Sequence, residues 1–135
     1  MNRSLLEVIK IDIEGRDFYK AYHSVGRIKH LELEESEEIR IYSTLIEGVM
    51  TMMKKKSQEA ITILLKIANN KKCLELGIHS LVLKYLAYGY FKTEEYGKSL
   101  KYYNKIPKGD MDKSSQYNKL LVEGIELSDT VHHFP

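Results

Sequence analysis

Three stretches of this chain repeat one pattern of side-chain sizes at a fixed interval of 39 residues. Each begins with a small residue, at Ala21, Ala60 and Ser99. A large residue follows four positions later and an isoleucine three positions after that, in the triplets Val25, Leu64, Tyr103 and Ile28, Ile67, Ile106. Intervals of four and three place these side chains on one face of a helix. A period of this length is typical of helical solenoids, in which each unit buries its apolar face against its neighbours. Because solenoids mostly bind other molecules, the pattern favours binding over catalysis.

Capping residues and helix breakers divide the chain into seven expected helices. Ser4 and Glu7 have the spacing of a capping box, and Ser36 is a candidate N-cap. Pro107 ends the helix before it, because proline disfavours helical backbone at the preceding residue. The expected helices are Ser4–Gly15, Asp17–His30, Ser36–Lys55, Ser57–Asn70, Lys72–Lys92, Thr93–Ile106 and Lys113–Ser128, with Ser57 and Thr93 as further N-caps and with Gly77 able to delay the start of the fifth helix. Tyrosine and isoleucine recur at helical spacing and do not alternate, so the sequence predicts an all-α fold without strands.

A chain of 135 residues is long enough for one domain. We expect residues 1–128 to form a single right-handed α-solenoid of about three helix-turn-helix repeats, and residues 129–135 to form a flexible tail. The helix after Lys113 is expected to cap the stack, because Lys119, Glu123 and Glu126 give it polar positions around its circumference. The quartet at positions 45–48, Leu-Ile-Glu-Gly, returns at 121–124 as Leu-Val-Glu-Gly, and its glycine allows close helix approach.

Charge and cysteine content argue against several classes of protein. The 21 basic and 19 acidic side chains leave a formal charge of +2, which does not favour binding to nucleic acid or to an anionic membrane. Cys73 is the single cysteine, so no intramolecular disulfide is possible and a reducing compartment is expected. No stretch approaches the ~18 apolar residues of a membrane span, and residues 1–10 lack the apolar core of a signal peptide. We therefore expect a cytoplasmic protein.

The third repeat carries the most specific motif. Residues 86–107 resemble a tetratricopeptide repeat: Leu86 and Ala87 take the place of the Leu-Gly pair, and Ser99 that of the small residue where the helices cross. The aromatic and apolar positions of the motif are held by Tyr90, Tyr96, Tyr103 and Ile106. The second and first repeats match at fewer positions. The resemblance implies a stack of paired antiparallel helices.

The long period narrows the resemblance further. An interval of 39 residues exceeds the usual ~34 of tetratricopeptide repeats. Longer repeats of this kind are similar to those of the peptide-sensing regulators of Gram-positive bacteria and their phages, of the Rap and arbitrium-receptor type. This resemblance implies a regulatory role. Those proteins carry more repeats and an additional effector domain, so their phosphatase and DNA-binding activities are not expected here.

The expected concave face is formed by the first helix of the second and third repeats. The partner-binding residues that this geometry predicts are Tyr42, Leu45, Val49, Met52, Lys84, Tyr88, Phe91 and Lys92. Aromatic and methionine side chains supply adaptable apolar contact, and the lysines would select an acidic group. The alternative is that the methionines at 50, 52 and 53 only fill gaps in the core.

The function predicted from these features is non-catalytic binding of a protein or peptide, as a small regulator or inhibitor. The sequence contains no phosphate-binding loop, nucleophile elbow or catalytic Cys–His arrangement, so we predict no enzymatic activity and no cofactor. No histidine pair has a metal-ligand spacing, and no metal site is predicted. The alternative is a homodimeric scaffold that associates through its apolar stripe. A fragment of a phosphatase-type or transcriptional regulator is a less favoured alternative.

Two charged segments have both a functional and a plain interpretation. The acidic segment 32–38 is either a docking patch for a basic partner or a solvated helix start. The lysines at 98, 101, 105 and 108 are either a phosphate-binding stripe or one ordinary helix face.

Overall fold

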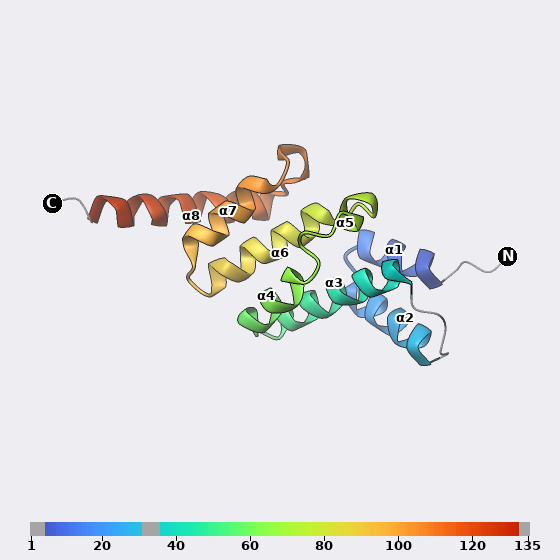
Figure 1. Cartoon of the computed structure of the whole chain (residues 1–135). Helices are drawn as coiled ribbons and strands as arrows, with labels where there is room; N and C mark the ends of the chain where they lie inside the picture. The colour runs from blue at the N-terminus through green and yellow to red at the C-terminus, as the bar shows by residue number, and fades with distance from the viewer. Residues whose placement is uncertain (1–4, 31–35, 133–135) are drawn as a thin grey trace.

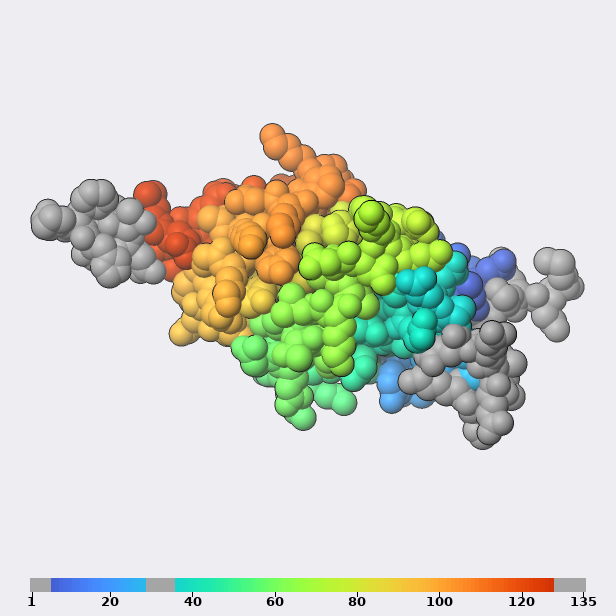
Figure 2. Space-filling model, viewed as in Figure 1, coloured from blue at the N-terminus to red at the C-terminus, as the bar shows by residue number. Residues whose placement is uncertain are grey.

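The described residues form helices joined by turns and contain no strand, which confirms the all-α prediction. The structure is a computed structural model and describes residues 5–30 and 36–132; the predicted Ser4 cap and residues 32–35 of the acidic segment lie outside these ranges. The elements are α1 (Leu5–Glu14), α2 (Phe18–His30), α3 (Glu37–Met53), α4 (Ser57–Leu65), α5 (Lys72–Glu75), α6 (His79–Lys92), α7 (Tyr96–Lys105), the 3-10 turn η1 (Lys108–Asp110) and α8 (Lys113–His132). Figure 1 shows them in chain order across an elongated molecule, and the segment around η1 projects from its surface in Figure 2.

Helices that are adjacent in the chain pack against each other. The hairpins α1/α2, α3/α4 and α6/α7 each form one pair, and α2 packs on α3, α4 on α6 and α7 on α8. Figure 1 shows that α3 and α4, like α6 and α7, run in opposite directions. Because most contacts are between sequence neighbours, the fold extends along one direction, with α1 and α2 at one end and α8 at the other.

The small residues of the 39-residue pattern are buried between helices. Ala21, Ala60 and Ser99 are all 0% exposed, as the pattern predicts. The Ser99 hydroxyl donates a 2.7 Å hydrogen bond to the carbonyl of Ala87, so the α6/α7 crossing also has a buried polar contact. Gly48 allows a similarly close approach in the α3/α4 hairpin. A Cβ at this position would lie 2.5 Å from Cδ2 of Leu64, so a larger residue would hold the two helices apart.

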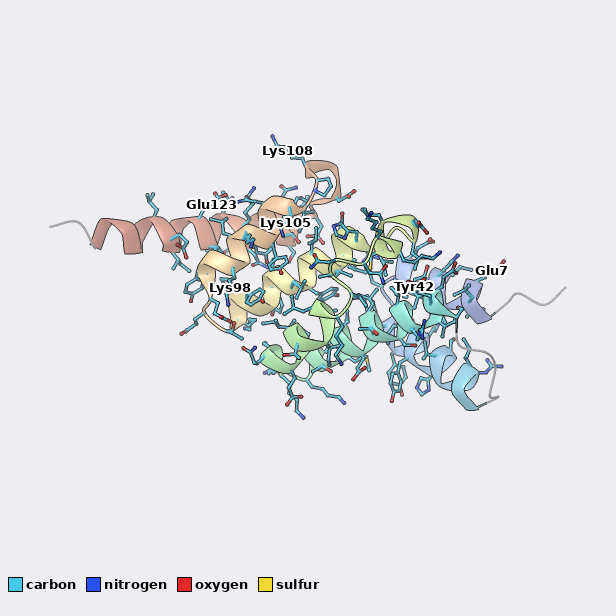
Figure 3. All side chains as sticks on the ribbon, viewed as in Figure 1. Glu7, Tyr42, Lys98, Lys105, Lys108 and Glu123 are labelled. Carbon is cyan, nitrogen blue, oxygen red and sulfur yellow. The ribbon has the colours of Figure 1, made fainter. Side chains whose placement is uncertain are left out.

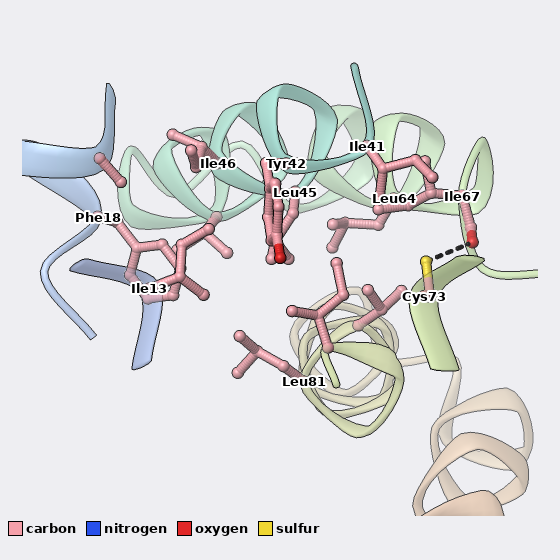
Figure 4. Close-up of a cluster of buried hydrophobic side chains, with 14 of the residues drawn as sticks. Ile13, Phe18, Ile41, Tyr42, Leu45, Ile46, Leu64, Ile67, Cys73 and Leu81 are labelled. Atoms are coloured by element: carbon pink, nitrogen blue, oxygen red, sulfur yellow. Dashed lines mark hydrogen bonds between the residues drawn. The ribbon is translucent and has the colours of Figure 1, made fainter. Parts of the chain in front are cut away.

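Two hydrophobic clusters form the core. The larger extends from α1 to α6 and includes Ile13, Phe18, Leu45 and Leu64, part of which Figure 4 shows. The smaller lies between α6, α7 and α8 around Ala87, Tyr103 and Val122. The side chains on the inner faces of successive helices therefore hold the stack together through burial of apolar surface.

Cys73 belongs to the larger cluster. Its thiol is 0% exposed and donates a 3.3 Å hydrogen bond to the carbonyl of Ile67 (Figure 4). Burial raises the pKa of this thiol above its ordinary value, which keeps it protonated. The cysteine is therefore a core residue of the α4–α5 connection.

Several predicted helix boundaries are wrong. The expected helix over 72–92 is two helices, because Gly77 adopts φ +72° and breaks the chain between α5 and α6. Ser57 lies inside α4 and caps nothing; the N-cap position is Lys56. Thr93 ends α6 instead of starting α7, and its hydroxyl donates to the carbonyl of Tyr90. Ser36 is confirmed as the N-cap of α3, with its hydroxyl accepting from the amide of Ile39.

The last helix also differs from the expectation. α8 continues to His132, through residues predicted to form a tail. It does not present a polar outer face, because Tyr117, Leu120 and Leu127 are 63%, 66% and 66% exposed. Of the polar residues on which the capping prediction depended, Lys119 pairs with Glu123 at 3.9 Å and Glu126 lies beside Gly97 of α7.

The break at Gly77 gives a first testable prediction. Gly77→Ala should lower the free energy of unfolding by about 1 kcal/mol, because an L-residue is strained at φ +72°. Gly26→Ala is the matched control, since Gly26 lies inside α2 with nothing near its Cβ position. It should raise the free energy of unfolding by up to about 1 kcal/mol through helix propensity. Urea denaturation measures both, and equal midpoints for the two variants would contradict the prediction.

Candidate functional site

The candidate site is a groove of about 680 Å³. It lies between the end of α1, the side of α3, the α5–α6 connection and η1. Its lining comes from all of these elements and consists of Lys10, Ile13, Glu14, Arg16, Tyr42, Leu74, Glu75, Leu76, Gly77, Ile78, His79, Ser80, Leu81, Lys84, Asp110 and Asp112. The turn at Gly77 makes the groove, because it separates the short α5 from α6 and lets both contribute to the wall.

The groove is apolar toward the core and has one exposed apolar side chain at its edge. Ile13 and Leu81 are 2% and 7% exposed, whereas Leu74 is 64% exposed. Tyr42 extends from α3 toward the side on which Ile13 and Leu81 lie (Figures 3 and 4). Burial, with the nearby carboxylates of Glu38 and Glu14, raises the pKa of Tyr42 to about 12. Its hydroxyl is therefore a neutral group that can donate or accept a hydrogen bond.

Charged and polar residues on one wall of the groove pair with each other. Ser80 donates a 2.7 Å hydrogen bond to Oδ2 of Asp110, and the ammonium of Lys84 contacts Oδ2 of Asp112. Burial acts to raise the pKa of Asp112, but hydrogen bonds from Lys84 and Ser115 outweigh it and hold that pKa below its ordinary value. These contacts attach η1 and the start of α8 to α6.

The opposite wall carries charges of both signs. Lys10 and Glu14 come from α1, and Arg16 follows it at φ +60°. The guanidinium of Arg16 donates a 2.9 Å hydrogen bond to the carbonyl of Ile13, which holds the side chain near the end of α1. The groove can therefore contact acidic and basic groups of a ligand as well as apolar ones.

A smaller cavity of about 280 Å³ lies on the other side of Lys84, between α6, α7 and the first turns of α8. Tyr88, Tyr103 and Asn118 are part of its lining. Burial raises the pKa of Tyr103 to about 12, although a hydrogen bond with Asn118 acts against the shift. Lys84 separates this cavity from the groove because it lines both.

The structure brings together only part of the predicted binding stripe. Tyr42 and Lys84 both line the groove, and Tyr88 lines the smaller cavity. Lys92 is exposed, with its ammonium 5.9 Å from the centre of the Tyr88 ring. Phe91 packs against the smaller core cluster and forms an edge contact with Tyr96.

The remaining three residues of the stripe are buried, and so is Tyr42, which is 1% exposed although it lines the groove. Leu45, Val49 and Met52 are 0%, 1% and 6% exposed in the larger cluster, so their assignment to a binding face is wrong. The cause is the close approach of α6. A Cβ on Gly89 would lie 2.9 Å from Cε of Met52, so the glycine lets α6 pack directly over this part of α3.

Sequence reasoning missed most of the groove. Lys10, Arg16 and Leu74 come from segments that were not assigned to any site. The sequence did indicate that Gly77 can delay the start of a helix, and α6 begins at His79, but it did not indicate that the turn there would line a groove. The pairing of Ser80 with Asp110 joins residues from two different repeats and has no local signature.

The lysine stripe on α7 contacts aromatic rings. The ammonium of Lys98 lies 5.6 Å from the centre of the Tyr90 ring, and that of Lys105 lies 5.0 Å from the Tyr102 ring. The two rings stack with centroids 5.5 Å apart. Figure 3 shows Lys98 and Lys105 on α7 and Lys108 beyond its end. Cation–π contacts thus give two of these lysines a role in packing.

Within residues 5–30 and 36–132, no three histidine, cysteine or acidic side chains are grouped so as to hold a metal ion. Over the same part of the chain, none of the helices combines the length and the apolar character needed to cross a bilayer. Comparison of the chain with protein-family models, with curated proteins and with solved structures finds no match.

Proposed function

We propose that this chain is a tetratricopeptide-like helical repeat protein that binds a peptide or protein segment without catalysing a reaction. Support for the repeat comes from Ala21, Ala60 and Ser99, which are fully buried at intervals of 39 residues. Support for binding comes from the groove, where α1, α3, α5, α6 and η1 surround an apolar floor with polar walls. Such a combination is common in ligand sites.

The observation that carries the proposal is the exposed Leu74 at the edge of the groove. This leucine is 64% exposed beside Leu76 and Glu75, in a groove that also offers Lys10 and Arg16. An apolar side chain of a bound peptide would cover Leu74, and the backbone and charged groups of that peptide would contact the walls of the groove. Removing the apolar surface of this side chain from water on binding would contribute favourably to the binding free energy.

Binding without chemistry fits the state of two polar groups on the α6 wall of the groove. The hydroxyl of Ser80 and the ammonium of Lys84 already pair with Asp110 and Asp112. These groups support the wall of the groove and are not available as a nucleophile or a base. A regulatory role, in which the bound segment belongs to another protein, is the form of this proposal that the resemblance to peptide-sensing regulators favours.

A displayed library of random peptides tests the proposal. Peptides selected on the wild-type chain should bind Leu74→Ala at least tenfold more weakly, because the substitution removes apolar contact at the groove. Leu65→Ala is the matched control: Leu65 is 42% exposed on α4 and does not line the groove. Fluorescence anisotropy gives the dissociation constants. Equal loss for the two variants, or no loss for Leu74→Ala, would overturn the assignment of the groove.

A further inference from the structure

The smaller cavity, between α6, α7 and the first turns of α8, is walled by tyrosine rings and uncharged polar groups. Three tyrosines come from α6 and α7, at positions 85, 88 and 103, and the start of α8 adds the side chains of Ser114, Ser115 and Asn118. Lys84 is the one charged residue among the described residues that line it. The groove on the other side of Lys84 differs, because both carboxylates and cations line it. The two hollows therefore select for different chemical groups.

The charge of Lys84 is already neutralised. Its ammonium contacts Oδ2 of Asp112, and Oδ1 of the same carboxylate accepts a 2.7 Å hydrogen bond from the amide of Ser115. Lys92, whose ammonium lies 5.9 Å from the centre of the Tyr88 ring, is exposed and does not line the cavity, so water and salt screen its charge. A charged group that entered the cavity would lose its water without gaining an ion partner, which is unfavourable. The cavity therefore favours an uncharged group.

The size of the cavity and its tyrosine rings favour one aromatic side chain. A volume of about 280 Å³ lies just below the range of about 300–1,000 Å³ that is usual for sites of whole small molecules, so the cavity suits one side chain of a larger ligand. Tyr103 is 1% exposed and belongs to the smaller core cluster, so it forms a fixed wall, whereas Tyr85 and Tyr88 are half-buried. The edges and faces of such rings make favourable contacts with another aromatic ring.

The polar groups of the cavity favour a ring that carries a hydroxyl. The Tyr103 hydroxyl forms a hydrogen bond with Asn118, whose side-chain amide can form further ones. The hydroxyl of Ser114, an exposed residue, can both donate and accept. A phenol hydroxyl can pair with these groups, whereas a hydrocarbon ring would cover them and leave them unpaired at a cost in free energy. Tyrosine is the side chain that combines an uncharged six-membered aromatic ring with a hydroxyl.

We propose that the cavity is a second subsite of the peptide site and binds a tyrosine side chain of the segment that occupies the groove. This inference rests on the proposed function, since the groove supplies the rest of the contact. Lys84 lines both hollows, so a segment in the groove that passes over this side chain reaches the cavity. Tyr88 lies four residues after Lys84 on α6, about 6 Å along the helix, which is within the reach of one side chain.

Small probes that share a tolyl ring test the cavity without a peptide. They are p-cresol, which has the tyrosine hydroxyl, toluene, which lacks it, the anion p-toluate and the cation 4-methylbenzylammonium. In an NMR titration of the full chain, p-cresol should bind with a dissociation constant on the order of 10 mM, as expected for a ligand of this size, and should shift the amide signals of Tyr88 and Asn118. The other probes should bind about fivefold more weakly or worse. Equal or tighter binding by any of them overturns the assignment of a tyrosine side chain.

Two variants test whether p-cresol binds in the cavity. Tyr88→Ala removes one wall and should weaken p-cresol binding by about fivefold or more. Ser114→Phe fills the cavity from an exposed position in the first turn of α8, so it should block p-cresol with an unchanged circular dichroism spectrum. Tyr117→Ala is the matched control, since Tyr117 is 63% exposed and lines neither hollow. Binding of p-cresol that neither Tyr88→Ala nor Ser114→Phe weakens overturns the site.

Peptides selected on the wild-type chain separate this inference from the proposed function. The tightest of them should contain a tyrosine whose replacement by phenylalanine weakens binding about fivefold. The same replacement should have little effect on binding to the Ser114→Phe chain, because its cavity is filled. Peptides that depend on Leu74 but bind the wild type and Ser114→Phe equally overturn the second subsite and leave the proposed function standing. Binding of p-cresol in the cavity without any peptide that depends on Leu74 overturns the proposed function instead.

Discussion

Replacing Ser99 with leucine should destabilise the protein by about 3 kcal/mol or more. Ser99 is 0% exposed at the crossing of α6 and α7, and its hydroxyl is 2.7 Å from the carbonyl of Ala87. A leucine has no space there, so the two helices must separate, and the buried carbonyl loses a hydrogen bond. Since domains of this size are stable by only about 5–15 kcal/mol, the loss is a large fraction of the total. Chemical denaturation followed by circular dichroism measures it.

Ser99→Ala separates the two contributions. Alanine is small enough for the crossing and removes only the hydrogen bond, so its cost should be about 1 kcal/mol. A small cost for alanine with a large one for leucine would show that side-chain size dominates at this position. If leucine cost no more than alanine, the helices would not be held at the close approach that the structure has.

The parts of the fold that the sequence predicted depend on local spacing. Ala21, Ala60 and Ser99 are buried because a small residue at a fixed place in each helix is a property of the helix itself. The end of α7 before Pro107 and the start of α3 at Ser36 were likewise predicted from the local chain. In each case one or two residues determine the backbone, whatever packs against it.

Other features depend on which helix covers which face. Spacing alone could not show that Leu45 and Val49 face the core, because α3 is apolar on more than one side and either side could have been left open. Gly89 determines the outcome by allowing α6 to lie against Met52 and Ile61. That information is in the sequence, but it acts between residues far apart in the chain.

In the candidate site, too, single contact residues could be predicted from local spacing, whereas the arrangement of the walls could not. Tyr42 and Lys84 were predicted as contact residues and do line the groove. The wall formed by Asp110 and Asp112 was not predicted, because it depends on the contacts of these two carboxylates with Ser80 and Lys84 in α6. A groove made from several elements has no signature in any one of them.

The contact between Gly48 and Leu64 gives the second large effect. Leu64→Ala should lower the free energy of unfolding by about 3 kcal/mol, because the leucine is 0% exposed and its removal leaves a cavity between α3 and α4. Gly48→Ala should also be destabilising, by about 1 kcal/mol. Its Cβ would lie 2.5 Å from Cδ2 of Leu64, and this overlap outweighs the gain in helix propensity.

The two substitutions should not be additive. In the Leu64→Ala background the space beside Gly48 is open, so Gly48→Ala should there raise the free energy of unfolding by up to about 1 kcal/mol. The sign of its effect thus reverses, and a double-mutant cycle from urea denaturation should give a coupling of about 2 kcal/mol. Additivity within about 0.5 kcal/mol would contradict the direct contact of the two residues. The reversal distinguishes packing from propensity, because a propensity effect at Gly48 would be the same in both backgrounds.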